Sequence, residues 1–346
     1  MIETNMQYRL AFLGFGNVGR ALAELLLLKR DELSRDYGIQ YKVTAIATAR
    51  HGMAVNPNGL DLAGALDLIR SGQSLDILSQ KPVPDDFIEF IRRSGADLLF
   101  ENTPVDYETG QPAVDHIRTA LDLGMHVATD NKGAVVHAYR ELSELARLKN
   151  KHFFFESTVM DGTPIFSLFR DALPAAHCRS FRAILNSTTN LILTRMENGE
   201  SFDQAVRYAQ QIGISETDPA GDIDGRDAAI KVAALMTVLM NTPTKPSEVE
   251  YTGIRGITAE MVAAAKAEGQ RYKLICSAGY DGQRYTGRVA PERVVAGSCF
   301  YGVEGTSSLI QFETDSLGEL TLIENDPSPQ TTAYGLLADF IHAVQE

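Results

Sequence analysis

The chain has 346 residues, of which 44% are hydrophobic and 22% charged, so its composition is that of a folded globular protein and too apolar for a disordered one. Its 32 basic and 45 acidic side chains give a formal net charge of −13, which argues against a nucleic-acid partner, because phosphate binding relies on clustered Lys and Arg. The most apolar stretch, 232–240, is much shorter than the roughly 18 residues that indicate a membrane span.

Strand-like and helix-like segments alternate through the first half of the chain. Short apolar runs predict strands at 8–13, 43–47, 97–101, 125–129 and 153–156. Between them, periodic apolar residues predict helices at 21–28, 60–71, 87–93, 113–123 and 138–148. Strands separated by helices indicate βαβ units and therefore a parallel sheet in an α/β fold.

The pattern changes after residue 156. Helical segments are predicted at 165–172, 191–197, 202–212 and 228–240, followed by strands at 274–278, 285–289 and 308–314 that suit an antiparallel or mixed sheet. An amphipathic helix is predicted at 332–344. We therefore expect two domains, residues 1–156 and an α+β domain at 157–317, with the segment 318–346 packing back on the first.

The beginning of the chain and its cysteines bear on the compartment. The first ten residues carry an acid where a signal peptide carries a basic cluster, so secretion is not expected. The three cysteines form no CxxC pair, and so suggest neither a disulfide framework nor a zinc site. We expect a cytoplasmic protein with no membrane partner.

A glycine-rich turn follows the first predicted strand and opens the first predicted helix, with the sequence Gly14-Phe15-Gly16-Asn17-Val18-Gly19. In a GxGxxG motif the first glycine permits the tight turn and the second lets the backbone approach a pyrophosphate. The third lets the helix pack closely on the strand, and the helix N-terminus favours the phosphate charge. This motif inside a βαβ unit predicts a Rossmann-type doubly wound sheet that binds a dinucleotide.

The end of the second strand helps to distinguish NAD from NADP. A carboxylate there would bind the ribose 2′-hydroxyl, whereas an arginine would accommodate a 2′-phosphate. The segment 46–51 contains no acid but contains Arg50, which favours NADP. If Arg50 is only a solvated loop charge, NAD is accepted as well.

Four further stretches are unusually polar for their surroundings: 129–133, 156–164, 186–190 and 213–227. Each has an ordinary interpretation by itself. Lys132 would be a surface lysine, and residues 186–190 a helix N-cap. The acid-rich 213–227 would be a solvated loop, since it lacks the spacing of an EF-hand calcium site. Asp227 and Lys231, four residues apart, would be an exposed ion pair on one helix face.

Taken together and in this order, these stretches closely resemble the homoserine dehydrogenase family. The matching segments are GFGNVG, TDNKGAV, FESTVMDGTPI, NSTTNLIL and GISETDPAGDIDGRDAAIKVAAL. The most specific is similar to the family signature G-x-x-E-x-D-P-x-x-D-x-x-G-x-D-x-x-x-K, here running from Gly213 to Lys231. The resemblance spans residues 8–240, with weaker similarity beyond.

The resemblance implies an activity and a set of site residues. The family reduces L-aspartate 4-semialdehyde reversibly to L-homoserine with a nicotinamide cofactor, in threonine and methionine biosynthesis. Lys231 would be the general acid/base, assisted by Lys132, which also faces the cofactor. Glu216 would bind the substrate ammonium group, with Asp222 and Asp227 completing the pocket.

The resemblance also implies further ligand contacts. Thr103 and the backbone of Gly213 would contact the cofactor. A monovalent cation such as sodium would be held, largely through backbone carbonyls, in the loop carrying Glu156, Val159, Asp161 and Thr163. We expect a homodimer or higher homo-oligomer whose partner is a small amino-acid aldehyde.

The chemistry agrees with the residue types. Hydride delivery to an aldehyde develops negative charge on its oxygen, which a nearby ammonium group stabilises and protonates. Two lysines and several carboxylates around one site suit a zwitterionic amino acid.

Two departures from the family pattern keep an alternative open. Ser187 stands where the family usually has glycine, and residues 323–333 lack the family's G-x-G-A-G loop. The alternative is a paralogous oxidoreductase acting on another amino- or hydroxy-aldehyde. A cofactor-binding sensor without activity would have no use for Lys132 and Lys231. No C-terminal regulatory domain is expected after residue 346.

Overall fold

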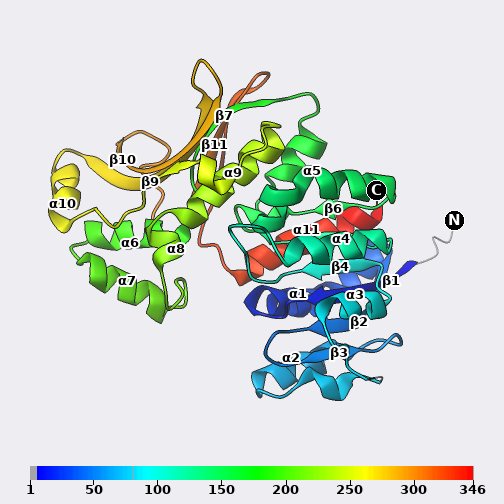
Figure 1. Ribbon diagram of the computed structural model, residues 1–346. Coiled ribbons are helices and arrows are strands. Elements are labelled where there is room, and N and C mark those ends of the chain that lie inside the picture. Colours follow the sequence, from blue (N-terminus) through cyan, green and yellow to red (C-terminus); the bar gives the residue numbers. More distant parts are fainter. Residues whose placement is uncertain (1–5, 81, 346) are drawn as a thin grey trace. The chain divides into compact units, whose positions relative to one another are not determined.

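The computed structural model describes residues 6–80 and 82–345 (Figure 1). The chain forms two compact units, one made of residues up to Pro164 together with those from Ser328 onward, and the other of Ile165–Pro327. The sequence analysis put the boundaries at 156 and 317. No helix in the described part of the chain combines the length and hydropathy needed to cross a membrane.

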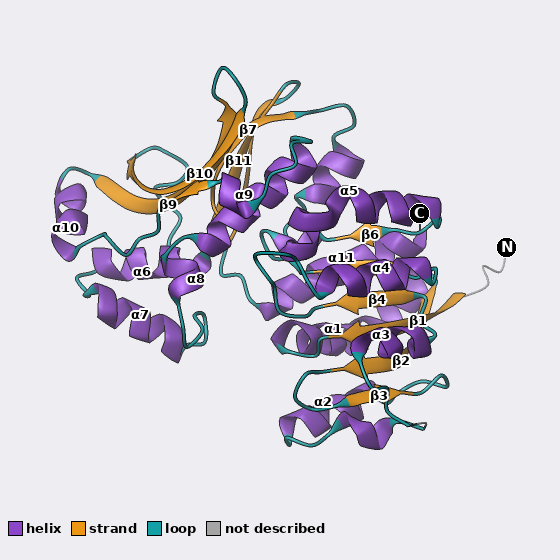
Figure 2. Cartoon of the chain, viewed as in Figure 1, coloured by secondary structure: helices purple, strands orange, loops and turns teal. Residues whose placement is uncertain are grey.

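Unit 1 is a Rossmann-type domain (Figure 2). Its elements are β1 (Met6–Leu13), α1 (Asn17–Asp36), β2 (Ile39–Ala47), β3 (Met53–Val55), α2 (Leu62–Arg70), η1 (Leu75–Leu78), α3 (Phe87–Ser94), β4 (Leu98–Glu101), α4 (Ala113–Asp122), β5 (His126–Thr129), α5 (Lys132–Leu148), β6 (Phe153–Phe154), η2 (Glu156–Thr158) and α11 (Pro329–Gln345). The strand order is β3-β2-β1-β4-β5-β6, the order of a dinucleotide-binding sheet. All neighbours are parallel except β2 and β3.

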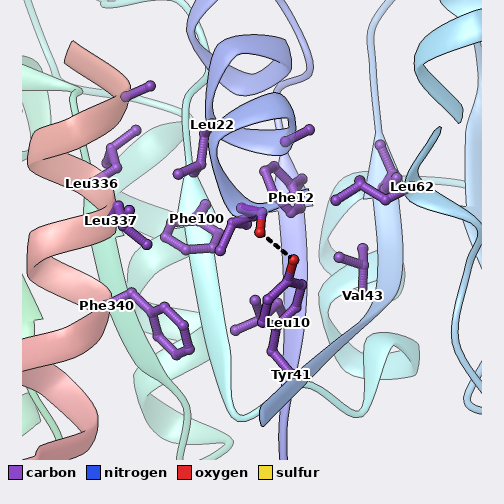
Figure 3. Packing of buried hydrophobic residues seen from close by; sticks show 14 of the residues in the cluster. Leu10, Phe12, Leu22, Tyr41, Val43, Leu62, Phe100, Leu336, Leu337 and Phe340 are labelled. Atoms are coloured by element: carbon purple, nitrogen blue, oxygen red, sulfur yellow. Dashed lines mark hydrogen bonds between the residues drawn. The ribbon is translucent and has the colours of Figure 1, made fainter. Parts of the chain in front are cut away.

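The core of unit 1 joins the two ends of the sequence. Helix α1 packs against α11, and Phe340 of α11 lies edge-on to Phe100 of β4, as Figure 3 shows. Phe12 of β1 is fully buried beside Phe100. The buried Tyr41 hydroxyl is satisfied by donating to the carbonyl oxygen of Leu26 at 2.6 Å. Helix α11 is therefore part of the Rossmann core.

Unit 2 is an α+β domain. Its elements are η3 (Leu168–Ala172), β7 (Cys178–Ile184), α6 (Ser187–Glu197), α7 (Phe202–Gln211), α8 (Ala220–Ile223), α9 (Arg226–Leu239), η4 (Pro246–Glu248), β8 (Glu250–Tyr251), α10 (Ala259–Ala267), β9 (Gln270–Tyr280), β10 (Tyr285–Val295), β11 (Ser308–Thr314) and β12 (Gly318–Glu324). The strand order is β12-β11-β7-β9-β10-β8. Every neighbouring pair is antiparallel except β10 and β8.

The predicted fold class is confirmed, and several boundaries differ for identifiable reasons. Helix α5 begins at Lys132 and is non-helical at Ala138, which is where the sequence pattern had placed its start. Of the segment 318–346, only α11 belongs to unit 1. Strand β12 pairs with β11, because the short turn 315–317 returns the chain directly alongside it.

Candidate active site

The glycine-rich turn in unit 1 has a different spatial requirement at each glycine. Gly14 has a φ of +100°, and a Cβ there would lie 2.2 Å from the carbonyl oxygen of Asn102. A Cβ on Gly19 would lie 2.5 Å from the carbonyl oxygen of Gly14, so this position holds α1 close to the strand end. A Cβ on Gly16 would meet nothing within 4 Å. The open position is the one at which the motif brings a pyrophosphate to the backbone.

The other residues of the turn divide between core and surface. Phe15 is buried with its ring edge-on to Phe12, and Val18 packs against the same core. Asn17 accepts a hydrogen bond from Arg20 at 2.7 Å. Gly16 caps α1 without a side chain, which leaves the first N–H groups of the helix to an anion. A cofactor phosphate would therefore be bound by backbone donors.

Arg50 lies in the bend after β2 and is exposed. The bend is shaped by Thr48, whose hydroxyl accepts a hydrogen bond from the backbone N–H of His51 at 2.6 Å. Arg50 thus lies near the carboxyl end of β2, where a Rossmann domain binds the adenosine ribose of its cofactor.

A buried carboxylate that the sequence analysis did not single out organises the ends of β4 and β5. Glu101 is fully buried, and its side chain accepts hydrogen bonds from the hydroxyls of Thr103 and Thr129. Nδ1 of His116, also buried, lies 3.3 Å from the same carboxylate. The only available signal was an acid at the end of the apolar run 98–101. By accepting the hydrogen bond from the Thr103 hydroxyl, Glu101 fixes the loop that carries Thr103.

Lys132 is the first residue of α5 and is half-buried. Asn131 caps this helix by accepting from the N–H of Gly133 at 3.1 Å, and its amide donates to the carbonyl of Thr103 at 3.0 Å. Burial raises the pKa of the adjacent Asp130 to about 6, with the charge of Glu101 acting in the same direction. The ends of β4 and β5 thus bring Lys132, Thr103 and an easily protonated acid together.

The loop expected to bind a cation is fastened to α11. The N–H of Glu156 donates to Asp339 at 3.0 Å, and the hydroxyl of Thr332 donates to Asp161. Asp161 has a φ of +43°. Val159 is buried, and Thr163 donates its N–H to the carbonyl of Met160 at 2.9 Å. Carboxylate and carbonyl oxygens, which this loop also carries, are the ligands that a hard cation takes. Among the described residues no group of three or more His, Cys, Asp or Glu side chains is arranged to hold a metal ion.

In unit 2, Lys231 is the centre of a compact polar network. Its Nζ donates to the carbonyl oxygen of Leu185 at 2.7 Å and lies 3.3 Å from Asp227 Oδ2. The Lys231 and Asp227 side chains are 17% and 12% exposed, so this ion pair is largely withdrawn from water. The surface-pair interpretation of Asp227 and Lys231 is therefore wrong, because helix α9 is packed into unit 2 along most of its length.

Asn186 joins two carboxylates to this network. Its amide donates to Asp222 Oδ1 at 2.7 Å and to Asp227 Oδ2 at 3.2 Å. Its Oδ1 accepts from the N–H of Thr189 at 2.8 Å and so caps α6. Burial raises the pKa of Asp222, and the nearby charge of Asp227 raises it further. The N-cap interpretation of 186–190 is confirmed for Asn186, but the same side chain also bridges the site acids.

Two predicted residues lie outside this network. Glu216 is exposed in the bend after α7, where its backbone carbonyl accepts a weak hydrogen bond from Gln210 at 3.4 Å. Gly213 is also exposed and has a φ of +77°. The structure therefore brings Asp222, Asp227 and Lys231 together and leaves Glu216 and Gly213 at the surface of unit 2.

Comparison with known proteins gives a consistent family assignment. The family models described as "Homoserine dehydrogenase, NAD binding domain" and "Homoserine dehydrogenase" match residues 14–156 and 164–341. The chain is 35% identical to a homoserine dehydrogenase of Methanocaldococcus jannaschii, with 95% of this chain and 96% of the relative covered. It is 32% identical to an NAD(+)-dependent homoserine dehydrogenase of Pseudomonas canavaninivorans, with 98% and 97% covered.

Solved structures agree with the sequence comparison. A structure from Archaeoglobus fulgidus matches with a TM-score of 0.86 at 29% identity, covering 97% of this chain and 98% of that one. A hyperthermophilic archaeal homoserine dehydrogenase in complex with NADPH matches with a TM-score of 0.81 at 31% identity, covering 98% of each chain. Both units are thus included in the similarity.

Proposed function

This chain belongs to the homoserine dehydrogenase family, and on that premise we propose how its residues carry out the family reaction, the reversible NAD(P)H-dependent reduction of L-aspartate 4-semialdehyde to L-homoserine. The observation that carries the assignment of roles is the Lys231 network, in which a largely buried ammonium group is held by one carbonyl and one carboxylate. A lysine held in this way is a positioned proton donor.

Unit 1 binds the cofactor. The backbone of the turn Gly14–Gly19 receives the pyrophosphate, at the open position of Gly16. Arg50 pairs with the 2′-phosphate and makes NADPH the preferred cofactor. One solved relative is in complex with NADPH, whereas another relative is named for NAD(+). Thr103, held by Glu101, and Lys132 would contact the nicotinamide end. When bound, the cofactor supplies the hydride.

Lys231 stabilises the oxygen of the aldehyde as negative charge develops there, and then protonates it. The Leu185 carbonyl and Asp227 fix the direction of the ammonium group, so little reorganisation is needed during the reaction. In the oxidative direction Lys231, in its neutral form, accepts the hydroxyl proton. Lys132 keeps the assisting role that the family resemblance implies for it.

The carboxylates bind the amino-acid end of the substrate. Asp222 and Asp227 are held in one place by Asn186. Burial and, after it, the charge of Asp227 raise the pKa of Asp222, and an ammonium group there would offset the repulsion between the two carboxylates. Glu216, being exposed, adds long-range attraction for the same ammonium group. This arrangement selects an amino aldehyde over an aldehyde that lacks the amino group.

Three further features belong to the proposal. A monovalent cation such as sodium stabilises the loop with Glu156, Val159, Asp161 and Thr163, and replacing sodium by a much larger cation should lower the thermal midpoint of unfolding. The enzyme is a homodimer or higher homo-oligomer, which light scattering tests. It acts in the cytoplasm, which cell fractionation tests.

The direct test of the function is a substrate panel with the wild-type protein. Loss of reduced-cofactor absorbance is followed with L-aspartate 4-semialdehyde and with the corresponding aldehyde lacking the amino group, each with NADPH and then NADH. We expect the highest kcat/KM with the amino aldehyde and NADPH. A higher kcat/KM with another amino- or hydroxy-aldehyde would instead assign the chain to a paralogous activity, for which the changed sequence at 324–330 is the reason.

A further inference from the structure

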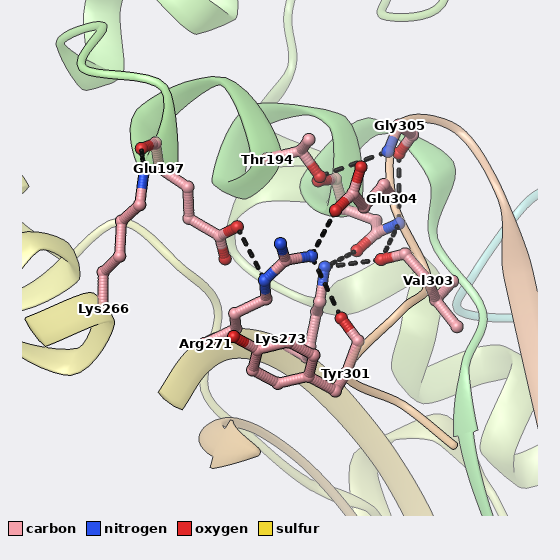
Figure 4. Close-up of polar contacts among 10 residues, drawn as sticks. Thr194, Glu197, Lys266, Arg271, Lys273, Tyr301, Val303, Glu304 and Gly305 are labelled. Atoms are coloured by element: carbon pink, nitrogen blue, oxygen red, sulfur yellow. Dashed lines mark hydrogen bonds and ion pairs between the residues drawn. The ribbon is translucent and has the colours of Figure 1, made fainter. Parts of the chain in front are cut away.

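A fully buried lysine on β9 takes no direct part in the proposed chemistry. Lys273 is 0% exposed, and its Nζ donates to Asn190 Oδ1 at 3.0 Å. It also donates to the carbonyl oxygen of Val303 at 2.5 Å (Figure 4). Both acceptors are neutral. Burying an ammonium group against neutral acceptors is costly, and an apolar side chain of similar volume would fill the same space with less desolvation. Packing alone therefore does not account for a lysine here.

The partner of Lys273 on α6, Asn190, fastens a loop to that helix. Its amide donates to the carbonyls of Val303 at 3.3 Å, Gly305 at 3.1 Å and Ser307 at 3.2 Å. Thr194, one turn further along α6, accepts from the N–H of Gly305 at 3.2 Å (Figure 4). The segment 303–307 is thus bound to α6 by directional hydrogen bonds, with Lys273 holding the asparagine that makes most of them.

Charged groups face Lys273 from three elements. They are Glu197 of α6, Arg271 of β9 and Glu304 of the loop. Arg271 lies 3.4 Å from Glu197, pairs with Glu304 and donates to the carbonyl of Tyr301 at 3.1 Å. The formal charges of the two acids, Glu197 and Glu304, balance those of the two bases, Arg271 and Lys273. A second lysine, Lys266 of α10, contacts the C-terminal end of α6 by donating to the carbonyl of Glu197 at 2.8 Å.

The other end of α6 is the proposed catalytic network. Asn190 is one turn after Asn186, and its N–H donates to the Asn186 carbonyl at 3.2 Å. Asn186 bridges the two site carboxylates, and the preceding residue, Leu185, supplies the carbonyl that accepts from Lys231. Because the Asn190 N–H is bonded to the carbonyl of Asn186, the N-cap of α6, we expect a shift at Asn190 to move Asn186 and the adjoining Leu185 as well.

We propose that Lys273 is a positioning residue for the reaction: by holding Asn190 and the loop 303–307, it sets the first turn of α6 so that Leu185 and Asn186 meet Lys231, Asp222 and Asp227. The inference rests on the proposed function of Lys231. It assigns the buried charge a geometric role, a use for which buried polar groups are retained in some proteins despite their desolvation cost.

The test compares Lys273→Met with Lys266→Met. Both substitutions remove an ammonium group that contacts α6. Lys273 contacts Asn190 near the N-terminus of this helix, whereas Lys266 contacts Glu197 at its C-terminus. For Lys273→Met we expect kcat to fall at least tenfold and the midpoint of the pH–rate profile to move, with an unchanged Kd for NADPH. Lys266→Met should match wild type in all three measurements. A purely structural role would reduce the amount of active enzyme without moving the pH–rate midpoint.

A second variant covers the case in which Lys273→Met does not fold. Asn190→Asp leaves an oxygen for Lys273 but removes the amide that donates to the loop carbonyls. It should reproduce the lowered kcat and the moved midpoint. If a folded Lys273→Met or Asn190→Asp protein has the wild-type kcat and pH–rate profile, the positioning role is wrong. If Lys231→Met retains turnover, the proposed function of Lys231 fails instead, whatever these variants do.

Discussion

Replacing Asn186 by leucine tests the bridge between the two site carboxylates. The substitution nearly preserves the size of the side chain but removes its 2.7 Å bond to Asp222, its 3.2 Å bond to Asp227 and its cap on the Thr189 N–H. An N-cap contributes about 1 kcal/mol and a hydrogen bond to a charged group about 1.5–3 kcal/mol. Adding the cap and the shorter bond, we expect Asn186→Leu to lower the free energy of unfolding by about 2.5–4 kcal/mol at neutral pH.

The loss should depend on pH, and the sign follows from Asp222. Burial and the charge of Asp227 raise its pKa, and removing the Asn186 donor raises it further. Between the unfolded Asp pKa of about 3.9 and the raised folded pKa, Asp222 is therefore protonated in the folded variant but ionised in the unfolded chain. The charge-dependent part of the loss is therefore small below about pH 4 and is fully present above the folded pKa, leaving about 1 kcal/mol from the cap at low pH.

Urea unfolding of variant and wild type at about pH 4 and at neutral pH measures the difference. The matched control is Ser201→Ala, which removes a neutral N-cap from α7 in the same unit. The control should cost about 1 kcal/mol at both pH values. An equal loss for Asn186→Leu at both pH values would refute the argument that its amide supports ionised carboxylates.

The remaining predictions concern the cofactor, the substrate and the core. Arg50→Ala should weaken NADPH binding by about 1.5–3 kcal/mol and leave NADH binding unchanged in fluorescence titrations; equal effects on both cofactors would show that Arg50 is only a loop charge. Because Glu216 is exposed, Glu216→Gln should raise KM for the amino aldehyde by no more than about fivefold, the value of about 1 kcal/mol. An aldehyde without the amino group should be unaffected, and an equal rise for both would make Glu216 a residue that orients its loop. Phe340→Ala should lower the stability of unit 1 by about 3–5 kcal/mol, because the ring is fully buried, and a thermal midpoint close to wild type would contradict this.

Local pattern predicted the parallel strands of the Rossmann unit but missed its short antiparallel strand β3, and it was less successful for unit 2. The strands of unit 1 are short, buried on both faces and therefore continuously apolar, as in 98–101, so they stand out in the sequence. Strand β7 was not predicted, because Arg179, Ser180 and Arg182 interrupt its buried residues. Strand β12 was also missed, since it is an edge strand in which no position is fully buried.

In the candidate site, too, local features could be predicted, whereas contacts between residues far apart in the sequence could not. The cap formed by Asn186 is a local feature and was predicted as an N-cap. Its bonds to Asp222 and Asp227 join residues 36 and 41 positions apart, and no local pattern reports them. Lys273 lies in an apolar strand, and its contact with Asn190 spans 83 positions, so only the fold brings the two together.

The measurement that most directly tests the account is the turnover of Lys231→Met with NADPH and L-aspartate 4-semialdehyde, followed as loss of reduced-cofactor absorbance. Lys231 is the proposed proton donor, so kcat should fall at least about 10²-fold, the lower range for general acid catalysis, while the protein still folds and binds NADPH as the wild type does. A kcat close to that of the wild type would show that Lys231 is not the proton donor.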